Sequence, residues 1–315
     1  MRKNNIIERR FFMRENNMVL GRLIVVLFAS LMLFAGCGGG GDDTSVTTTP
    51  GTGTISGTAV KGPVSGGTVT AFSTNSDGAK GGQIGTAMTD AQGNFLMDVG
   101  SHSGPVMMEM TGGSYTDEAT EIVMTMGSGD MMTAVVPSIT AGENVTNMQL
   151  TPLTSMAQQM AQNMSGGMTQ ANITQANSAM EQYFGVNDIL HTHPMDPLAN
   201  DSGTTATQEQ RNYGMTIAAM SQYAQMVGMT NSSGIVTAAM NDASDGQMNG
   251  MMGGTQITMG GGMMGGNMMQ PDAGTVGLAD AMQTFMQSVQ NHSGLTAQDM
   301  QALIDNLRTS NGTIQ

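Results

Sequence analysis

Methionine is the residue type whose number and spacing first suggest chemistry in this chain of 315 residues, which contains 36 methionines and one cysteine. Residues 247–270 hold eight of those methionines and eight glycines, and the tetrapeptide Met-Met-Gly-Gly occurs twice there. Thioether sulfurs are soft ligands that favour Cu(I) or Ag(I), and glycines let several sulfurs converge without backbone strain. The candidate ligands of such a soft-metal site are Met248, Met251, Met252, Met259, Met263, Met264, Met268 and Met269.

The enrichment has a second explanation, in which the methionines bind no metal. Methionine fills apolar cores adaptably, and it also occurs at Met107, Met108 and Met156, where leucine or valine would serve equally well. The stretch 247–270 would then be a mobile low-complexity insertion, or a set of exposed sulfurs that consume oxidants by forming sulfoxides. Both explanations stay open at this point.

Two histidines form a second candidate metal site. His191 and His193 lie two residues apart in an extended segment, so their imidazoles point to the same side. Together with Asp188 or Asp196 they are suited to bind Cu(II) or Zn(II). The alternative is a pair of solvated loop histidines, since a tight zinc site uses three or four fixed ligands.

No enzyme motif accompanies these candidates. The chain has no Gly-x-Ser-x-Gly nucleophile elbow, no His-Glu-x-x-His zinc motif and no Walker phosphate-binding loop. We interpret the adjacent acids Asp117 and Glu118 as a solvated face, not as an acid–base dyad. We therefore expect a protein without catalytic activity and without a cofactor, Cu(I) excepted if the methionine site is real.

The single cysteine predicts a location. Ala35 and Gly36 are the small residues that a membrane peptidase needs before the scissile bond, and the thiol of Cys37 can carry a lipid. Residues 1–36 thus resemble a bacterial lipoprotein signal peptide, although Phe34 stands where that pattern usually has leucine. Lipidated Cys37 would hold the protein on a membrane, because two or more acyl chains give stable anchoring.

An uncleaved membrane helix over residues 23–35 is the alternative, but thirteen residues span only about 20 Å, short of a hydrocarbon core of ~30 Å. Gly38 follows the cysteine in place of the aspartate associated with inner-membrane retention, so we expect the outer membrane or the cell surface. Translation from Met18 would give a more compact, positively charged signal than translation from Met1.

The charge excludes nucleic acid as a partner. Six of the ten basic residues precede Cys37, which leaves four against 22 acidic residues and a formal net charge of −18. Binding to phosphates needs clustered Lys and Arg, and the remaining four are scattered along the chain. A protein or polysaccharide partner is compatible with this charge. With Cys37 lipidated no disulfide can form, so the fold must be held together in other ways.

The sequence after the cysteine predicts a tether followed by two kinds of structure. Residues 37–52 are rich in Gly, Thr, Asp and Ser and cannot bury enough surface to order themselves. Residues 53–150 alternate short apolar runs with turn signals, which indicates a β-sandwich. The expected strands are 54–60, 67–72, 84–90, 93–99, 105–110, 121–126 and 134–137.

Within that part, residues 57–69 and 89–95 resemble the carboxypeptidase regulatory-like, or transthyretin-like, β-sandwich module. Pro63 and its flanking glycines turn one strand into the next, and Asp90 begins a hairpin turn after which Phe95 re-enters the core. The resemblance implies an Ig/transthyretin-like fold that serves as a spacer or a binding platform, and it implies no catalysis.

After residue 150 the apolar period changes to three or four, which predicts an α-helical domain over residues 151–315. About five helices are expected, at 153–164, 173–184, 213–224, 278–289 and 300–307, with loops at 165–171, 185–206 and 246–274. Thr296 and Asp299 form a capping pair at the start of the last helix.

These observations predict a membrane-anchored cell-envelope lipoprotein that acts as a non-catalytic binding or structural module. The alternative is a lipoprotein that binds or sequesters Cu(I) or Ag(I) through its methionine-rich loop. A hydrolase is a third hypothesis, which would need a defined cleft with a perturbed acid or histidine.

Overall fold

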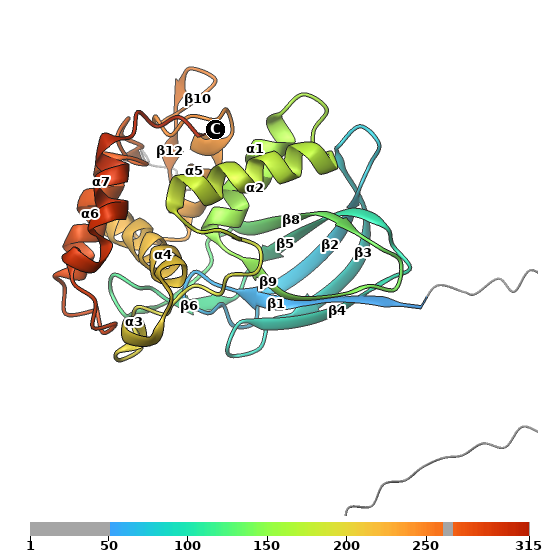
Figure 1. Cartoon of the computed structure of the whole chain (residues 1–315), viewed down its shortest axis with the longest axis horizontal. Coiled ribbons are helices and arrows are strands. Elements are labelled where there is room, and N and C mark those ends of the chain that lie inside the picture. The colour runs from blue at the N-terminus through green and yellow to red at the C-terminus, as the bar shows by residue number, and fades with distance from the viewer. Residues whose placement is uncertain (1–50, 261–266, 315) are drawn as a thin grey trace, which may run out of the picture. The chain divides into compact units, whose positions relative to one another are not determined.

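The computed structural model describes residues 51–260 and 267–314. The predicted signal, Cys37, all but the end of the tether, Met263 and Met264 lie outside the described residues. The described residues belong to one compact unit in which strands come first and helices follow (Figure 1). No described helix combines the length and the apolar character that crossing a membrane requires.

The first part of the described chain is built from two main sheets and a short hairpin. The strands up to Leu150 are β1 (Gly53–Ala59), β2 (Thr68–Thr74), β3 (Lys80–Met88), β4 (Asn94–Gly100), β5 (Gly104–Thr111), β6 (Ser114–Thr116), β7 (Val123–Thr125), β8 (Met131–Ile139) and β9 (Asn144–Leu150). One sheet has the order β4-β1-β9, with β1 antiparallel to β4 and parallel to β9. The other is antiparallel with the order β3-β2-β5-β8, and β6 pairs with β7. A mostly β part followed by helices is therefore confirmed.

The predicted turns are present between these strands. The Asp90 carboxylate accepts hydrogen bonds from the backbone N–H groups of Gln92 and Asn94, at 2.9 and 2.8 Å, and the bonds from Asn94 hold its pKa below the usual value. Phe95 is buried directly after this turn. Strands β6 and β9 were not expected, because β9 is mostly polar and its alternation is interrupted at Asn147, where φ is positive.

The second part is helical, and all five expected helices are present. The helices are α1 (Pro152–Asn163), α2 (Gln170–Phe184), α3 (Ser202–Thr205), α4 (Gln208–Met226), α5 (Gly234–Ala243), α6 (Val276–Met286) and α7 (Gln301–Thr309). A 3-10 turn, Ala297–Met300, precedes α7, and the backbone N–H of Thr296 donates to Asp299 as predicted.

Three expectations about the helices were wrong. Helix α5 was missed because it is short and begins with glycine, and α3 occupies part of a predicted loop. Val289 lies beyond the end of α6 and is 82% exposed. The predicted loop at 246–274 contains four two-residue strands, β10 (Met251–Met252), β11 (Thr255–Gln256), β12 (Thr258–Met259) and β13 (Asn267–Met268).

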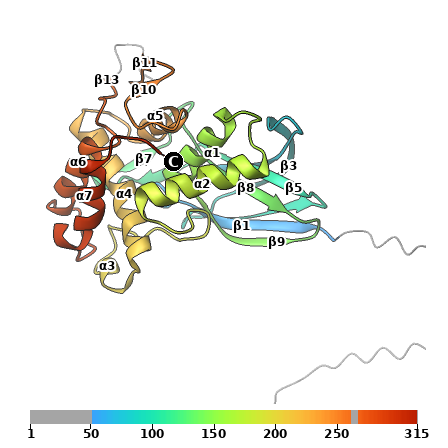
Figure 2. The ribbon, with the colours of Figure 1, turned by 45° about the horizontal axis from the view of Figure 1, so that its top comes forward.

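Helices α1 and α2 cover the four-stranded sheet on the side opposite β1 and β4, as Figures 1 and 2 show. Strands β5 and β8 of that sheet are therefore buried on both faces, whereas the edge strand β3 has no buried residue. This explains why Met107 and Met108, neighbours on β5, are both buried. Residues from both sheets and from the helices share one hydrophobic core.

Methionine is a main component of this core. Among the described residues 21 methionines are buried, including Met248, Met259 and Met269 from the predicted metal loop. For these three, the interpretation of methionine as an adaptable core residue fits the structure.

Candidate functional site

The most developed surface feature is a groove at the junction of the strands and the helices. It consists of two cavities of about 560 and 570 Å³, whose linings share Thr58, Asn94 and His193. The floor of the first cavity is the outer face of the β4-β1-β9 sheet. Ser56 lies in that floor, and its cross-strand partner Leu96 is 66% exposed. Leu96 therefore places an exposed apolar side chain beside the cavity.

The wall of the groove is the segment between α2 and α4. The backbone N–H of Gln149, on β9, donates to the carbonyl of Leu190 at 2.8 Å, and the N–H of Met195 donates to the carbonyl of Gln210 at 3.0 Å. These bonds fix the segment between the sheet and the first turn of α4. The groove therefore depends on both parts of the chain.

Both predicted histidines line the first cavity. His191 Nδ1 lies 2.9 Å from Asp188 Oδ2, and His193 Nδ1 lies 3.3 Å from Gln149 Oε1. Partial burial lowers the pKa of His193, and the Asp196 carboxylate opposes this shift. His193 is therefore neutral at pH 7 and can donate or accept a hydrogen bond.

The structure does not complete a metal site around these histidines. Within residues 51–260 and 267–314, no three His, Cys, Asp or Glu side chains are grouped so that they could hold an ion. Metal binding by His191 and His193 stays a prediction.

The groove carries negative and neutral polar groups. Glu209 lies in the first lining, Glu118 and Asp196 lie in the second, and no Lys or Arg occurs among the described residues of either. The other polar side chains are mainly amides and hydroxyls, which suit hydrogen bonding to a neutral or cationic ligand. An anionic ligand would meet no compensating charge here.

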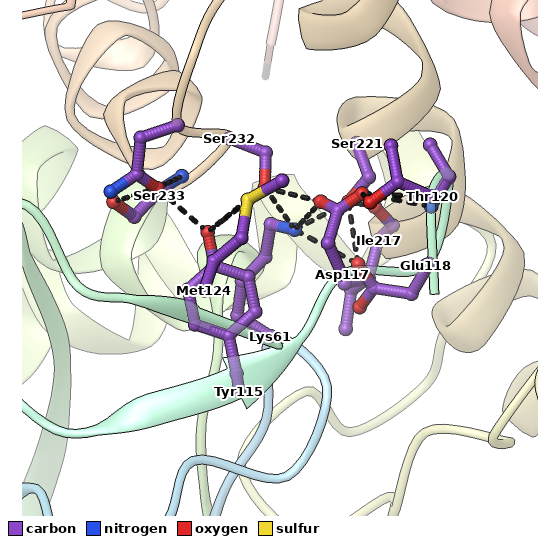
Figure 3. A network of polar contacts seen from close by, with 12 residues as sticks. Lys61, Tyr115, Asp117, Glu118, Thr120, Met124, Ile217, Ser221, Ser232 and Ser233 are labelled. Carbon is purple, nitrogen blue, oxygen red and sulfur yellow. Dashed lines mark hydrogen bonds and ion pairs between the residues drawn. The ribbon is translucent and has the colours of Figure 1, made fainter. Parts of the chain in front are cut away.

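Beneath the second cavity lies a buried ionic network that joins the strands to the helices (Figure 3). Lys61, which follows β1, is fully buried, and its Nζ lies 2.9 Å from Glu118 Oε2 and 3.6 Å from Asp117 Oδ2. Both carboxylates are at most 3% exposed. Asp117 and Glu118 are thus not a solvated face, because a lysine that was unremarkable in the sequence compensates their charge.

Hydroxyl groups complete this network. Ser221 on α4 donates to Glu118 at 2.5 Å and also contacts Lys61 Nζ. Ser232, just before α5, contacts Lys61 and Asp117, and it lies 2.9 Å from the hydroxyl of Tyr115. The ammonium of Lys61 therefore has hydrogen-bond partners in Glu118, Ser221 and Ser232, which makes the network rigid.

Lys61 does not activate a serine of this network as a nucleophile. Burial alone would lower the pKa of Lys61, but the carboxylates of Glu118 and Asp117 outweigh this and raise the pKa above its usual value. Lys61 is therefore protonated at neutral pH and cannot take a proton from Ser221 or Ser232 as a general base.

The methionine-rich segment contributes sulfurs to two environments. Met248 and Met269 pack into the core beside Tyr223, whereas Met251, Met252 and Met268 are between 38% and 46% exposed. These exposed thioethers lie on the short hairpins β10–β11 and β12–β13.

A buried carboxylate holds the start of the β10–β11 hairpin. Asp242 Oδ1 accepts hydrogen bonds from the backbone N–H groups of Asn249 and Gly250, at 2.9 and 2.6 Å, while Oδ2 is buried without a partner. Burial raises the pKa of Asp242 to about 6. This residue carried no signal in the sequence, because its burial depends on the unexpected helix α5.

Comparison with known proteins gives no family. No protein-family model matches the chain, and no curated protein matches it. One partly similar solved structure is a 9R-lipoxygenase from Cyanothece PCC8801, with 9% identity and a TM-score of 0.20. The match covers 60% of this chain but only 25% of the lipoxygenase, and such a low TM-score supports no conclusion about fold or function. The resemblance to the carboxypeptidase regulatory-like module stays a prediction.

Proposed function

We propose that this chain is a lipid-anchored protein of the bacterial cell envelope, at the outer membrane or cell surface, that binds a polar ligand in its groove without catalysis. The observation that supports binding is the groove itself, in which two cavities of about 560 and 570 Å³ adjoin at His193. Its side chains predict a ligand that is neutral or positively charged and rich in hydrogen-bonding groups, such as an oligosaccharide.

The absence of catalysis is part of the same proposal. The serines nearest to a lysine, Ser221 and Ser232, belong to the buried network beneath the groove, where Lys61 is protonated. A transthyretin-like module used as a binding platform would agree with this arrangement, because the floor of the groove is a sheet.

Ligand binding can be tested with the chain from Gly38 onward, which contains the compact unit. Neutral oligosaccharides, spermidine and inorganic phosphate would be titrated separately and followed by NMR. We expect shifts with a neutral or cationic probe, lost in the double variant Asn94→Ala/Gln149→Ala. Asn306→Ala, an exposed amide on α7, is the matched control. Binding of phosphate alone, or binding that survives the double variant, would count against the groove.

The anchor needs a separate test, because Cys37 lies outside the described residues. Bacteria that express the full chain would be fed an alkyne-labelled fatty acid. We expect label and membrane fractionation for the wild type and loss of both for Cys37→Ala. Unlabelled wild-type protein would refute the anchor while leaving the groove untouched.

A soft-metal site is the second candidate function, supported by the three exposed thioethers Met251, Met252 and Met268 on adjoining hairpins. Anaerobic Cu(I) titration against a competing chelator should give binding tighter than about micromolar. The triple change of these methionines to leucine should abolish it, whereas Met88→Leu, an exposed methionine on β3, should not. Equal binding by both variants would reject the site.

A further inference from the structure

We propose that Lys61 and Glu118 become joined by an amide bond between Nζ and Cδ, so that the folded chain carries an internal covalent crosslink. The bond would connect the turn after β1 to the turn between β6 and β7, 57 residues later in the chain. It is independent of the ligand and of the anchor proposed above.

The geometry already holds the two reacting groups together. Lys61 Nζ lies 2.9 Å from Glu118 Oε2, and the side chains are 0% and 3% exposed. Lys61 Nζ donates a hydrogen bond to Ser232, and Ser221 donates one to the Glu118 carboxylate, so both the amine and the carboxylate are restricted. Groups fixed in this way react as if at very high concentration, because the entropy of bringing them together has already been lost.

The neighbouring acid supplies the proton transfers. Nζ gives one proton to Asp117, whose Oδ2 is 3.6 Å away, and Asp117 passes it to Oε1 of Glu118, so that a neutral amine attacks Cδ of a neutral carboxyl group. Ser221 donates to Oε2 and stabilises the negative charge that develops there. The C–Oε1 bond breaks as Oε1 takes a second proton from the attacking nitrogen. Ammonium and carboxylate thus give an amide and one water, without oxidant or reductant.

The surroundings favour the product. Two carboxylates and one ammonium are buried together, and amide formation removes one charge of each sign from an environment where charges are costly. Glu118 also lines the second cavity of the groove, which gives the released water a way out.

The charged ion pair is the stable form before reaction, so the neutral amine is a minor species. This is compatible with the proposal because the bond has to form only once in each molecule, and a slow step suffices. The mature chain has no cysteine available for a disulfide, so such an amide would be a covalent constraint of another kind.

Intact mass spectrometry of the folded chain from Gly38 onward tests the proposal. We expect nearly all molecules to be lighter than the sequence mass by one water. Trypsin should then fail to cleave after Lys61, and the peptide that ends at Lys80 should stay joined to the peptide 81–211. Lys80 and Glu109 serve as an internal control, because they are 2.6 Å apart but solvent-accessible and should stay unlinked.

Two variants separate this bond from other sources of water loss. Lys61→Met should have its full sequence mass, and Asp117→Asn, which removes the proton acceptor, should slow or prevent crosslinking while the circular dichroism spectrum shows that it folds. Full mass in aged, folded wild type would overturn the proposal. A loss of one water that persists in Lys61→Met would also overturn the proposal. The water would then come from another reaction, such as succinimide formation at Asp77 and Gly78.

Discussion

Asp242 is the residue whose replacement should reveal most about how this fold depends on pH. Its carboxylate is buried, only one of its two oxygens has hydrogen-bond partners, and its pKa is raised from 3.8 to about 6. The folded state therefore binds a proton more readily than the unfolded state. Stability from this group is fully present below about pH 4 and is lost as pH rises through about 6.

The size of the effect follows from the shift. One pKa unit corresponds to about 1.4 kcal/mol, so ionisation of Asp242 costs up to about 3 kcal/mol at neutral pH. Asn keeps the oxygen that accepts from Asn249 and Gly250 and carries no charge. Asp242→Asn should therefore be more stable than the wild type by up to about 3 kcal/mol at pH 7.5. For domains of this size that is an increase in Tm of about 6–12 °C.

Thermal and urea unfolding of both proteins between pH 4 and pH 8 would measure this difference. The gain should shrink steadily below pH 6 and vanish near pH 4, where the wild type is protonated. Asp245→Asn is the matched control, because Asp245 is exposed and its charge is the smallest contribution to the raised pKa of Asp242, and it should show little change. A variant that is less stable than the wild type at pH 7.5, or a difference that does not vary with pH, would refute the reasoning.

Three further substitutions test the packing by urea unfolding. Lys61→Ala should cost about 3–5 kcal/mol, because the buried carboxylates of Asp117 and Glu118 are then left with neither a cation nor the proposed amide bond; a loss below about 1 kcal/mol would contradict both the network and the bond. Gly57→Ala should cost about 1–3 kcal/mol or more, since the new Cβ would overlap the backbone oxygen of Met148; unchanged stability would mean that β1 and β9 are further apart. Tyr213→Phe should cost about 1–3 kcal/mol, because the buried hydroxyl lies 2.6 Å from Thr151 Oγ1; a neutral result would show that this bond contributes nothing.

The sequence predicted elements whose signals are local. The Asp90 turn, the capping pair at Thr296 and the periodic helices depend on a few neighbouring side chains, and the structure has all of them. Strand β9 was missed because its apolar residues are few, and helix α5 was missed because it is short and begins with glycine. The place of both elements in the fold depends on distant partners.

The candidate site was only partly predictable for the same reason. His191 and His193 were identified, yet the groove around them is built from β1, β4, β9 and α4. The interpretation of Asp117 and Glu118 as solvated failed because Lys61, far away in sequence, faces them. The lone charge of Lys61 among the apolar residues 59–64 is the signal that would have suggested a buried acidic partner, since burying an unpaired charge is costly.

The same network predicts that the strands do not form an independent domain. Lys61, Asp117 and Glu118 come from the strand part, but the hydroxyls that satisfy them come from Ser221 and Ser232 in the helical part. A chain of residues 51–150 would expose one face of the four-stranded sheet and open this cluster to water. We therefore expect it to lack a cooperative thermal transition and dispersed NMR signals, whereas the chain from residue 51 to the end shows both. A well-folded fragment of residues 51–150 would contradict this prediction, because it would show that the strands bury a hydrophobic core of their own.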